Sequence, residues 1–272
     1  MNKNRTIKVM GIVNLTDDSY FSDSRCADVK AALERIEAML EEGADIIDIG
    51  ACSTRPGSLP VGADEEWRRL EPVLGAVKER FPEIVVSIDT YWASVVEKAY
   101  ALMGDFIVND ISAGEDDPQM LPTVGRLGLQ YIAMHKRGTP EHMQNNTDYD
   151  NLLEEILEYF KIFGKKAEKH GICNWILDPG FGFSKTIEQN YNLLKSLADF
   201  RQVLLPDGNT VPVLVGVSRK SMIYKRFGIT PEESLPATQV LHFHALQNGA
   251  DILRVHDVAE AKRTIELYQM LK

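Results

Sequence analysis

The chain has 272 residues, a formal net charge of −10 at pH 7, 44% hydrophobic residues and 26% charged residues. This composition is typical of a globular protein, an acidic chain without a basic run argues against nucleic-acid binding, and no apolar run is long enough to cross a membrane. The three cysteines are far apart and form no CxxC pair, so neither a zinc ribbon nor a disulfide framework is indicated, and reduced thiols of a cytoplasmic protein fit best.

Eight short apolar runs follow one another along the chain, and each ends in polar residues. They cover residues 7–16, 44–57, 85–90, 106–112, 130–140, 175–183, 211–221 and 251–258. Strands that alternate with helices at this spacing predict a single α/β domain over residues 1–272, a (β/α)8 TIM barrel with its site at the carboxyl ends of the strands. A doubly wound open sheet is the alternative, and it fits less well because polar residues follow all eight strands.

Helical patterns fill the intervals between these runs. The first has apolar residues at Val29, Leu33, Ile36 and Leu40, with Asp28 as the expected N-cap. Similar stripes start at residues 67, 153 and 258, and Gly43 and Gly171 stand where helices end. We interpret these stripes as core packing against the barrel.

Cationic and hydroxyl side chains gather after the last two strands. The run Ser218-Arg219-Lys220-Ser221 follows the seventh strand, and Arg254 and His256 belong to the eighth. Because this end of a TIM barrel commonly binds phosphate, the pattern predicts an anion or substrate site.

Asp89, Asn109 and Asp178 end the third, fourth and sixth strands. Ionised aspartate only accepts hydrogen bonds, so these groups favour a ligand rich in N–H donors, with helix N-capping as the alternative role. No metal motif is present, although magnesium bridging phosphates needs only one or two protein oxygens. We interpret Cys52 as a small packing residue, since no base accompanies it in the sequence.

Nine segments together resemble the dihydropteroate synthase family, and they span nearly the whole chain. They are MGIVNLT (10–16), GADIIDIG (43–50), STRPG (53–57), SIDT (87–90), IVNDIS (107–112), MH with RGTP and MQ (134–144), ILDPGFGF (176–183), GVSRKS (216–221) and RVHDV (254–258).

The resemblance implies a transferase of folate biosynthesis that joins 6-hydroxymethyl-7,8-dihydropterin diphosphate to 4-aminobenzoate. It implies pterin and diphosphate contacts from Thr54, Asp89, Asn109, Asp178, Lys220, Arg254 and His256. It implies catalytic roles for Asp23, Arg55, Lys220, Arg254 and His256. It implies an aminobenzoate pocket of Thr54, Pro56, Phe183 and Ser221, and Asn14 as a ligand of Mg²⁺. The family is a sulfonamide target, and its members are typically homodimers.

Two segments depart from the family pattern. Residues 14–25 read NLTDDSYFSDSR where the family has NLTPDSFSDGG, and Cys52 replaces a common glutamate. A pterin-dependent methyltransferase and a non-catalytic pterin-binding paralogue are the alternative functions. The STRPG and SRKS segments favour the synthase, because methyl transfer needs neither a diphosphate site nor an aminobenzoate site. Sensitivity to sulfonamides is left open by these departures.

Overall fold

The computed structural model describes residues 6–15, 25–52, 61–138, 142 and 146–272. Eight parallel strands alternate with helices, which confirms the predicted (β/α)8 barrel. The strands are β1 (Lys8–Asn14), β2 (Ile46–Gly50), β3 (Val86–Asp89), β4 (Ile107–Asp110), β5 (Gln130–Met134), β6 (Trp175–Asp178), β7 (Leu214–Val215) and β8 (Ile252–Val255). The helices are α2 (Arg25–Glu41), α3 (Ala63–Arg80), α4 (Ala93–Met103), α5 (Met120–Leu127), α6 (Leu152–Lys169), α7 (Ile187–Lys195), η2 (Leu197–Gln202), α8 (Ser221–Phe227), α9 (Leu235–Gln247) and α10 (Val258–Met270).

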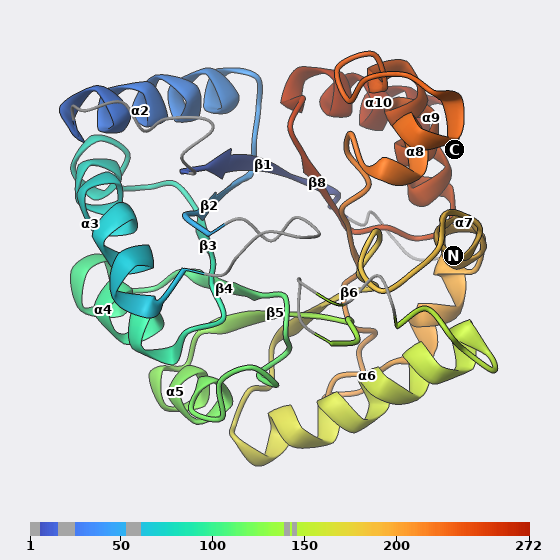
Figure 1. Cartoon of the computed structure of the whole chain (residues 1–272), viewed down its shortest axis with the longest axis horizontal. Coiled ribbons are helices and arrows are strands. Elements are labelled where there is room, and N and C mark those ends of the chain that lie inside the picture. The colour runs from blue at the N-terminus through green and yellow to red at the C-terminus, as the bar shows by residue number, and fades with distance from the viewer. Residues whose placement is uncertain (1–5, 16–24, 53–60, 139–141, 143–145) are drawn as a thin grey trace.

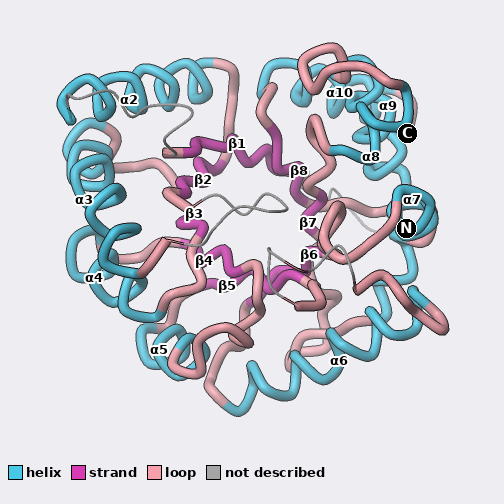
Figure 2. The backbone as a smooth tube through the Cα atoms, viewed as in Figure 1, coloured by secondary structure: helices cyan, strands magenta, loops and turns pink. Residues whose placement is uncertain are grey.

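The strands pair in the order β6-β5-β4-β3-β2-β1-β8-β7. A parallel bridge from Leu177 of β6 to Val213, just before β7, joins the two ends of the sheet. The amide of Leu177 also donates to the carbonyl of Pro212 at 2.9 Å. The strands therefore form an inner ring, and the helices surround it (Figures 1 and 2).

Side chains inside the barrel form two layers with different chemistry. The lower layer is an apolar cluster of Met10, Ile46, Ile107, Ile132, Ile176, Leu214 and Ile252. Because side chains alternate along a strand, the residue two positions later faces the same interior. Four of these seven positions carry polar residues, namely Asp48, Asn109, Asp178 and Arg254, and Asp89 on β3 is in register with Asn109. A polar layer thus lies directly above a sealed apolar one, at the carboxyl ends of the strands.

The helices pack their apolar stripes against the outside of the barrel, as the sequence predicts. In α3, for example, Leu70, Leu74 and Val77 are buried. The expected start of α2 is wrong: the helix begins at Arg25, so Asp28 lies inside it and is not its N-cap. Gly43 has a φ of 95° after this helix, which is the left-handed conformation expected at a helix end. Among the described residues, no helix is both long and apolar enough to cross a membrane.

Candidate active site

A buried ion cluster links three strands at the carboxyl end of the barrel. Arg254 Nε of β8 donates to Asp48 Oδ2 at 2.7 Å, and its Nη2 donates to Asp89 Oδ2 at 2.9 Å. Asn109 Nδ2 donates to the two carboxylate oxygens of Asp48 at 3.3 and 3.1 Å. The side chain of Asp48 is fully buried, so these contacts replace all of its hydration.

Burial shifts the pKa values of the groups around this cluster. The pKa of Asp89 is raised to about 7 by burial, although Arg254 opposes the shift. Burial also raises the pKa of Asp178, against the charge of Lys220 and the amide of Gly180. The pKa of Lys220 is lowered to about 8, again by burial. A ligand that donates hydrogen bonds to these carboxylates would stabilise their charged forms.

Lys220 reaches from the turn after β7 to the loop after β6. Its Nζ donates to the carbonyl of Phe181 and lies 4.9 Å from the ring centroid of Phe183. Ser221 follows it as the first residue of α8. Lys220, Phe183 and Ser221 therefore stand together at one side of the barrel mouth.

Arg219, next to Lys220 in the predicted anion site, forms an ion pair with Asp257. Its Nε donates to Asp257 Oδ2 at 2.9 Å, and its Nη2 donates to Asp257 Oδ1 at 2.5 Å. This bidentate contact pairs the guanidinium with a carboxylate, and anion binding by Arg219 stays a prediction. His256, which precedes Asp257, instead meets Ser218, whose Oγ lies 3.0 Å from Nδ1.

The structure places Asn14 at the end of β1, paired in register with Gly50 at the end of β2. It is partly exposed, at the same end of the barrel as the ion cluster. The other predicted site residues lie outside the described part of the chain: Asp23, Thr54, Arg55 and Pro56.

Asp48 is a central residue that sequence reasoning missed. It is the only charged residue of β2, a strand that is buried throughout, and it lies two positions before Gly50. A charged residue inside an otherwise apolar strand was the sequence signal that could have identified it. Lys185 was missed as well. It is buried, and its Nζ donates to the carbonyls of Gly180 and Phe183 and contacts His135 Nδ1 at 3.1 Å. Nothing local in the sequence distinguishes this lysine from a surface one.

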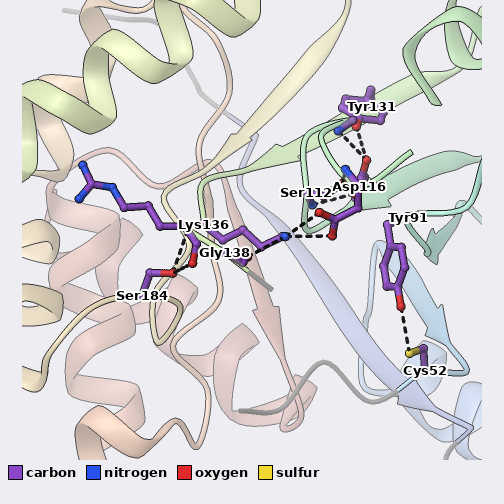
Figure 3. Close-up of polar contacts among 11 residues, drawn as sticks. Cys52, Tyr91, Ser112, Asp116, Tyr131, Lys136, Gly138 and Ser184 are labelled. Carbon is purple, nitrogen blue, oxygen red and sulfur yellow. Dashed lines mark hydrogen bonds and ion pairs between the residues drawn. The ribbon is translucent and has the colours of Figure 1, made fainter. Parts of the chain in front are cut away.

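Polar contacts also tie together the loops around the mouth (Figure 3). Lys136 Nζ binds the carboxylate of Asp116 at 2.9 and 3.0 Å, which connects the loop after β5 to the loop after β4. Cys52 Sγ lies 3.8 Å from the hydroxyl of Tyr91. Burial raises the pKa of the Cys52 thiol, which supports its interpretation as a packing residue.

Comparison with known proteins identifies a matching family and similar proteins. The pterin binding enzyme family matches residues 10–256. A dihydropteroate synthase of Escherichia coli (strain K12) is 38% identical over 263 residues, which cover 95% of this chain and 90% of that protein. The chain belongs to the dihydropteroate synthase family.

Solved structures of dihydropteroate synthases share the whole fold. A Yersinia pestis dihydropteroate synthase in complex with a sulfonamide drug has a TM-score of 0.89 and 34% identity, with 98% of this chain and 94% of that chain covered. A Xanthomonas albilineans dihydropteroate synthase with 4-aminobenzoic acid has a TM-score of 0.87 and 35% identity, with 98% and 93% covered. The family resemblance and the assignment as a transferase of folate biosynthesis are therefore confirmed.

Proposed function

We propose that the carboxyl end of the barrel joins 6-hydroxymethyl-7,8-dihydropterin diphosphate to 4-aminobenzoate, giving 7,8-dihydropteroate and diphosphate. The observation that carries this assignment is the buried set of Asp89, Asn109 and Asp178 beside Arg254 and Lys220. A pterin has an edge of N–H donors and a carbonyl, which matches carboxylate and amide acceptors next to a lysine donor.

The contacts of Asn109 support its role toward the pterin. Its Nδ2 donates to Asp48, so the amide oxygen is the atom that can accept from a ligand N–H. Asp178 Oδ1 accepts from the amide of Gly180 at 2.8 Å, which fixes the carboxylate while its other oxygen can accept from the ring. Lys220, beside Phe183, completes the ring site from the turn after β7.

The second substrate is proposed to lie nearer the mouth, against Phe183. An aromatic ring packs on an aromatic side chain with an offset or edge-on geometry, and Ser221 supplies a hydroxyl beside it. We propose that Thr54 and Pro56 complete this pocket.

The diphosphate needs positive charge and N–H donors. The contacts of Arg254 use Nε and Nη2, so Nη1 is the group that can reach a phosphate oxygen. His256 lies two residues further along the chain, and we propose that Arg55 and Asp23 act from their loops.

Asn14 fits the role of magnesium ligand by its chemistry. Its side-chain amide offers a hard oxygen ligand at the barrel mouth, and the ion takes most of its other ligands from phosphates and water. When bound, magnesium would neutralise charge on the leaving diphosphate.

The bond changes follow from these positions. The C–O bond to the diphosphate breaks with its electron pair leaving on oxygen, and the electron-rich dihydropterin stabilises the resulting cation. Arg254 and His256 stabilise the departing charge, which is where preorganised donors contribute most. The neutral amine of 4-aminobenzoate forms the new C–N bond and then loses a proton, so no nucleophile–base pair is required.

The deciding experiment measures diphosphate release from dihydropterin diphosphate and magnesium, with and without 4-aminobenzoate. We expect release that depends on 4-aminobenzoate and yields dihydropteroate. Tight pterin binding without turnover would instead favour a binding-only paralogue or a methyltransferase.

A homodimer and a cytoplasmic location remain predictions. Exposed apolar side chains support an interface on α9 and α10, where Val240 is 68% and Leu267 is 56% exposed. Light scattering on the purified protein tests the dimer, because a monomer at all concentrations contradicts it.

A further inference from the structure

Two pairs of residues connect the turn after β7 to the turn after β8. Ser218 Oγ lies 3.0 Å from His256 Nδ1, and it accepts from the backbone amide of His256 at 3.2 Å. The next residues along each turn, Arg219 and Asp257, form the bidentate ion pair described above. Residues 218–219 are thus fixed against residues 256–257 by side-chain contacts at both positions.

The backbone conformation of Arg219 makes the side chains of Ser218 and Lys220 point in different directions. Its φ of 51° lies in the left-handed region, which residues other than glycine rarely adopt. The amide of Arg219 donates to Thr238 Oγ1 at 3.3 Å, and the amide of Lys220 donates to the carbonyl of Val217 at 3.2 Å. This tight turn sends Lys220 toward the loop after β6 and keeps Ser218, which is 4% exposed, against His256.

The chemistry of a hydroxyl suits it to hold an imidazole in one orientation. One lone pair of Ser218 Oγ accepts from the His256 amide, so the hydroxyl hydrogen can be donated to Nδ1 of a neutral ring. A neutral imidazole that accepts at Nδ1 carries its hydrogen on Nε2. In a protonated ring, Nδ1–H donates to the second lone pair of Oγ, and Nε2 again carries a hydrogen.

The backbone of His256 is fixed independently of its ring. Arg35 Nη2 of α2 donates to the His256 carbonyl at 2.6 Å, which links the residue to α2. The main chain is therefore held by Ser218 and Arg35, and the Ser218 hydroxyl also contacts Nδ1 of the ring.

We propose that Ser218 is a positioning residue, which holds the imidazole of His256 through Nδ1 so that an Nε2–H donor meets the diphosphate of the substrate. The identity of that anion rests on the proposed function. Ser218 acts only through His256, and the donor it orients gains strength as charge develops on the leaving group.

The first test reads the tautomer directly. Enzyme labelled with ¹⁵N at histidine is compared as wild type, Ser218→Ala, Ser218→Thr and Ser87→Ala, and the His256 signals are those missing from a His256→Gln sample. Ser87 is a matched control because it is a buried barrel serine whose hydroxyl has no hydrogen-bond partner among the described residues. We expect the Nε2–H tautomer in wild type, Ser218→Thr and Ser87→Ala, and a mixture of tautomers in Ser218→Ala.

The second test reads binding and rate. We expect Ser218→Ala to weaken the affinity for inorganic diphosphate with magnesium about three- to tenfold, the range for one lost hydrogen bond. We expect kcat/KM for dihydropterin diphosphate to fall by a similar factor, with KM for 4-aminobenzoate unchanged. Ser87→Ala should match wild type in each measurement.

An unchanged tautomer and unchanged diphosphate affinity in Ser218→Ala would overturn the proposal. If Ser218→Ala does not fold, Ser218→Thr carries the test, and loss of the Nε2–H tautomer in a folded threonine variant overturns it. Absence of synthase turnover in the wild type would refute the proposed function alone, because the labelling and diphosphate measurements need no turnover.

Discussion

Replacing Asp48 with asparagine tests the buried ion cluster at the centre of the barrel. Asp48 is fully buried, it accepts from Arg254 Nε at 2.7 Å and from Asn109, and its Oδ2 lies 2.6 Å from Arg254 Nη2. Removing one partner of a buried ion pair costs about 3–5 kcal/mol. Because Arg254 keeps its contact with Asp89 at 2.9 Å, we expect the lower end of this range, about 3 kcal/mol.

Urea unfolding followed by circular dichroism measures this loss. Asp45→Asn is the control, because Asp45 is 36% exposed where it binds Lys262, and we expect it to cost about 1 kcal/mol. Asp48→Leu should be partly rescued when Arg254 is also changed to Met, since the buried guanidinium that lost Asp48 is then removed; the rescue is partial because Asp89 loses its own contact with Arg254. A loss for Asp48→Asn no larger than that of the control, or no rescue in the double variant, would refute the reasoning.

Three further predictions concern the residues around this cluster. Asp178→Ala should abolish dihydropterin binding in calorimetry, and retained affinity would contradict the role proposed for its carboxylate. Burial raises the pKa of Glu66 from 4.5 to about 8, so the folded chain holds a proton that the unfolded chain releases, and stability falls as pH rises across this window. Glu66→Gln should therefore be more stable than wild type in urea at pH 8, and this gain in stability should shrink as the pH falls toward 4.5. A gain that does not change with pH would exclude the raised pKa of Glu66 as its cause. Gly180→Ala should cost about 3 kcal/mol, because its Cβ would lie 2.0 Å from the His135 carbonyl oxygen, whereas Gly128→Ala has open space and should cost less in the same thermal unfolding measurement.

The barrel itself was predictable from local sequence patterns. Each strand is a short apolar run that ends in a polar residue, and the strand period of two places Asp89, Asn109 and Asp178 at the same end of the barrel. The helical stripes were equally local, as the buried Leu70 and Leu74 of α3 show. These features depend on neighbours within a few residues.

The features that sequence reasoning missed depend on partners far along the chain. Arg219 is neutralised by Asp257, which is 38 residues away, so its local surroundings could not distinguish it from the inward-facing Lys220. Asp48 meets Arg254 across 206 residues, and neither local pattern signals the pair. The start of α2 was also missed, because Asp28 has good N-cap chemistry inside a helix that extends three residues further toward the N-terminus.

The separation of 206 residues between Asp48 and Arg254 has a consequence for biogenesis. The cluster needs one residue from the second strand and one from the last, and β1, which lies between them, must pair with both. A nascent chain can therefore expose seven strands without having assembled the pocket. Such long-range closure slows folding, because the entropy of the intervening loop is lost before the contact forms. Ligand binding by this enzyme therefore requires that synthesis has reached β8 and that the ring of strands has closed.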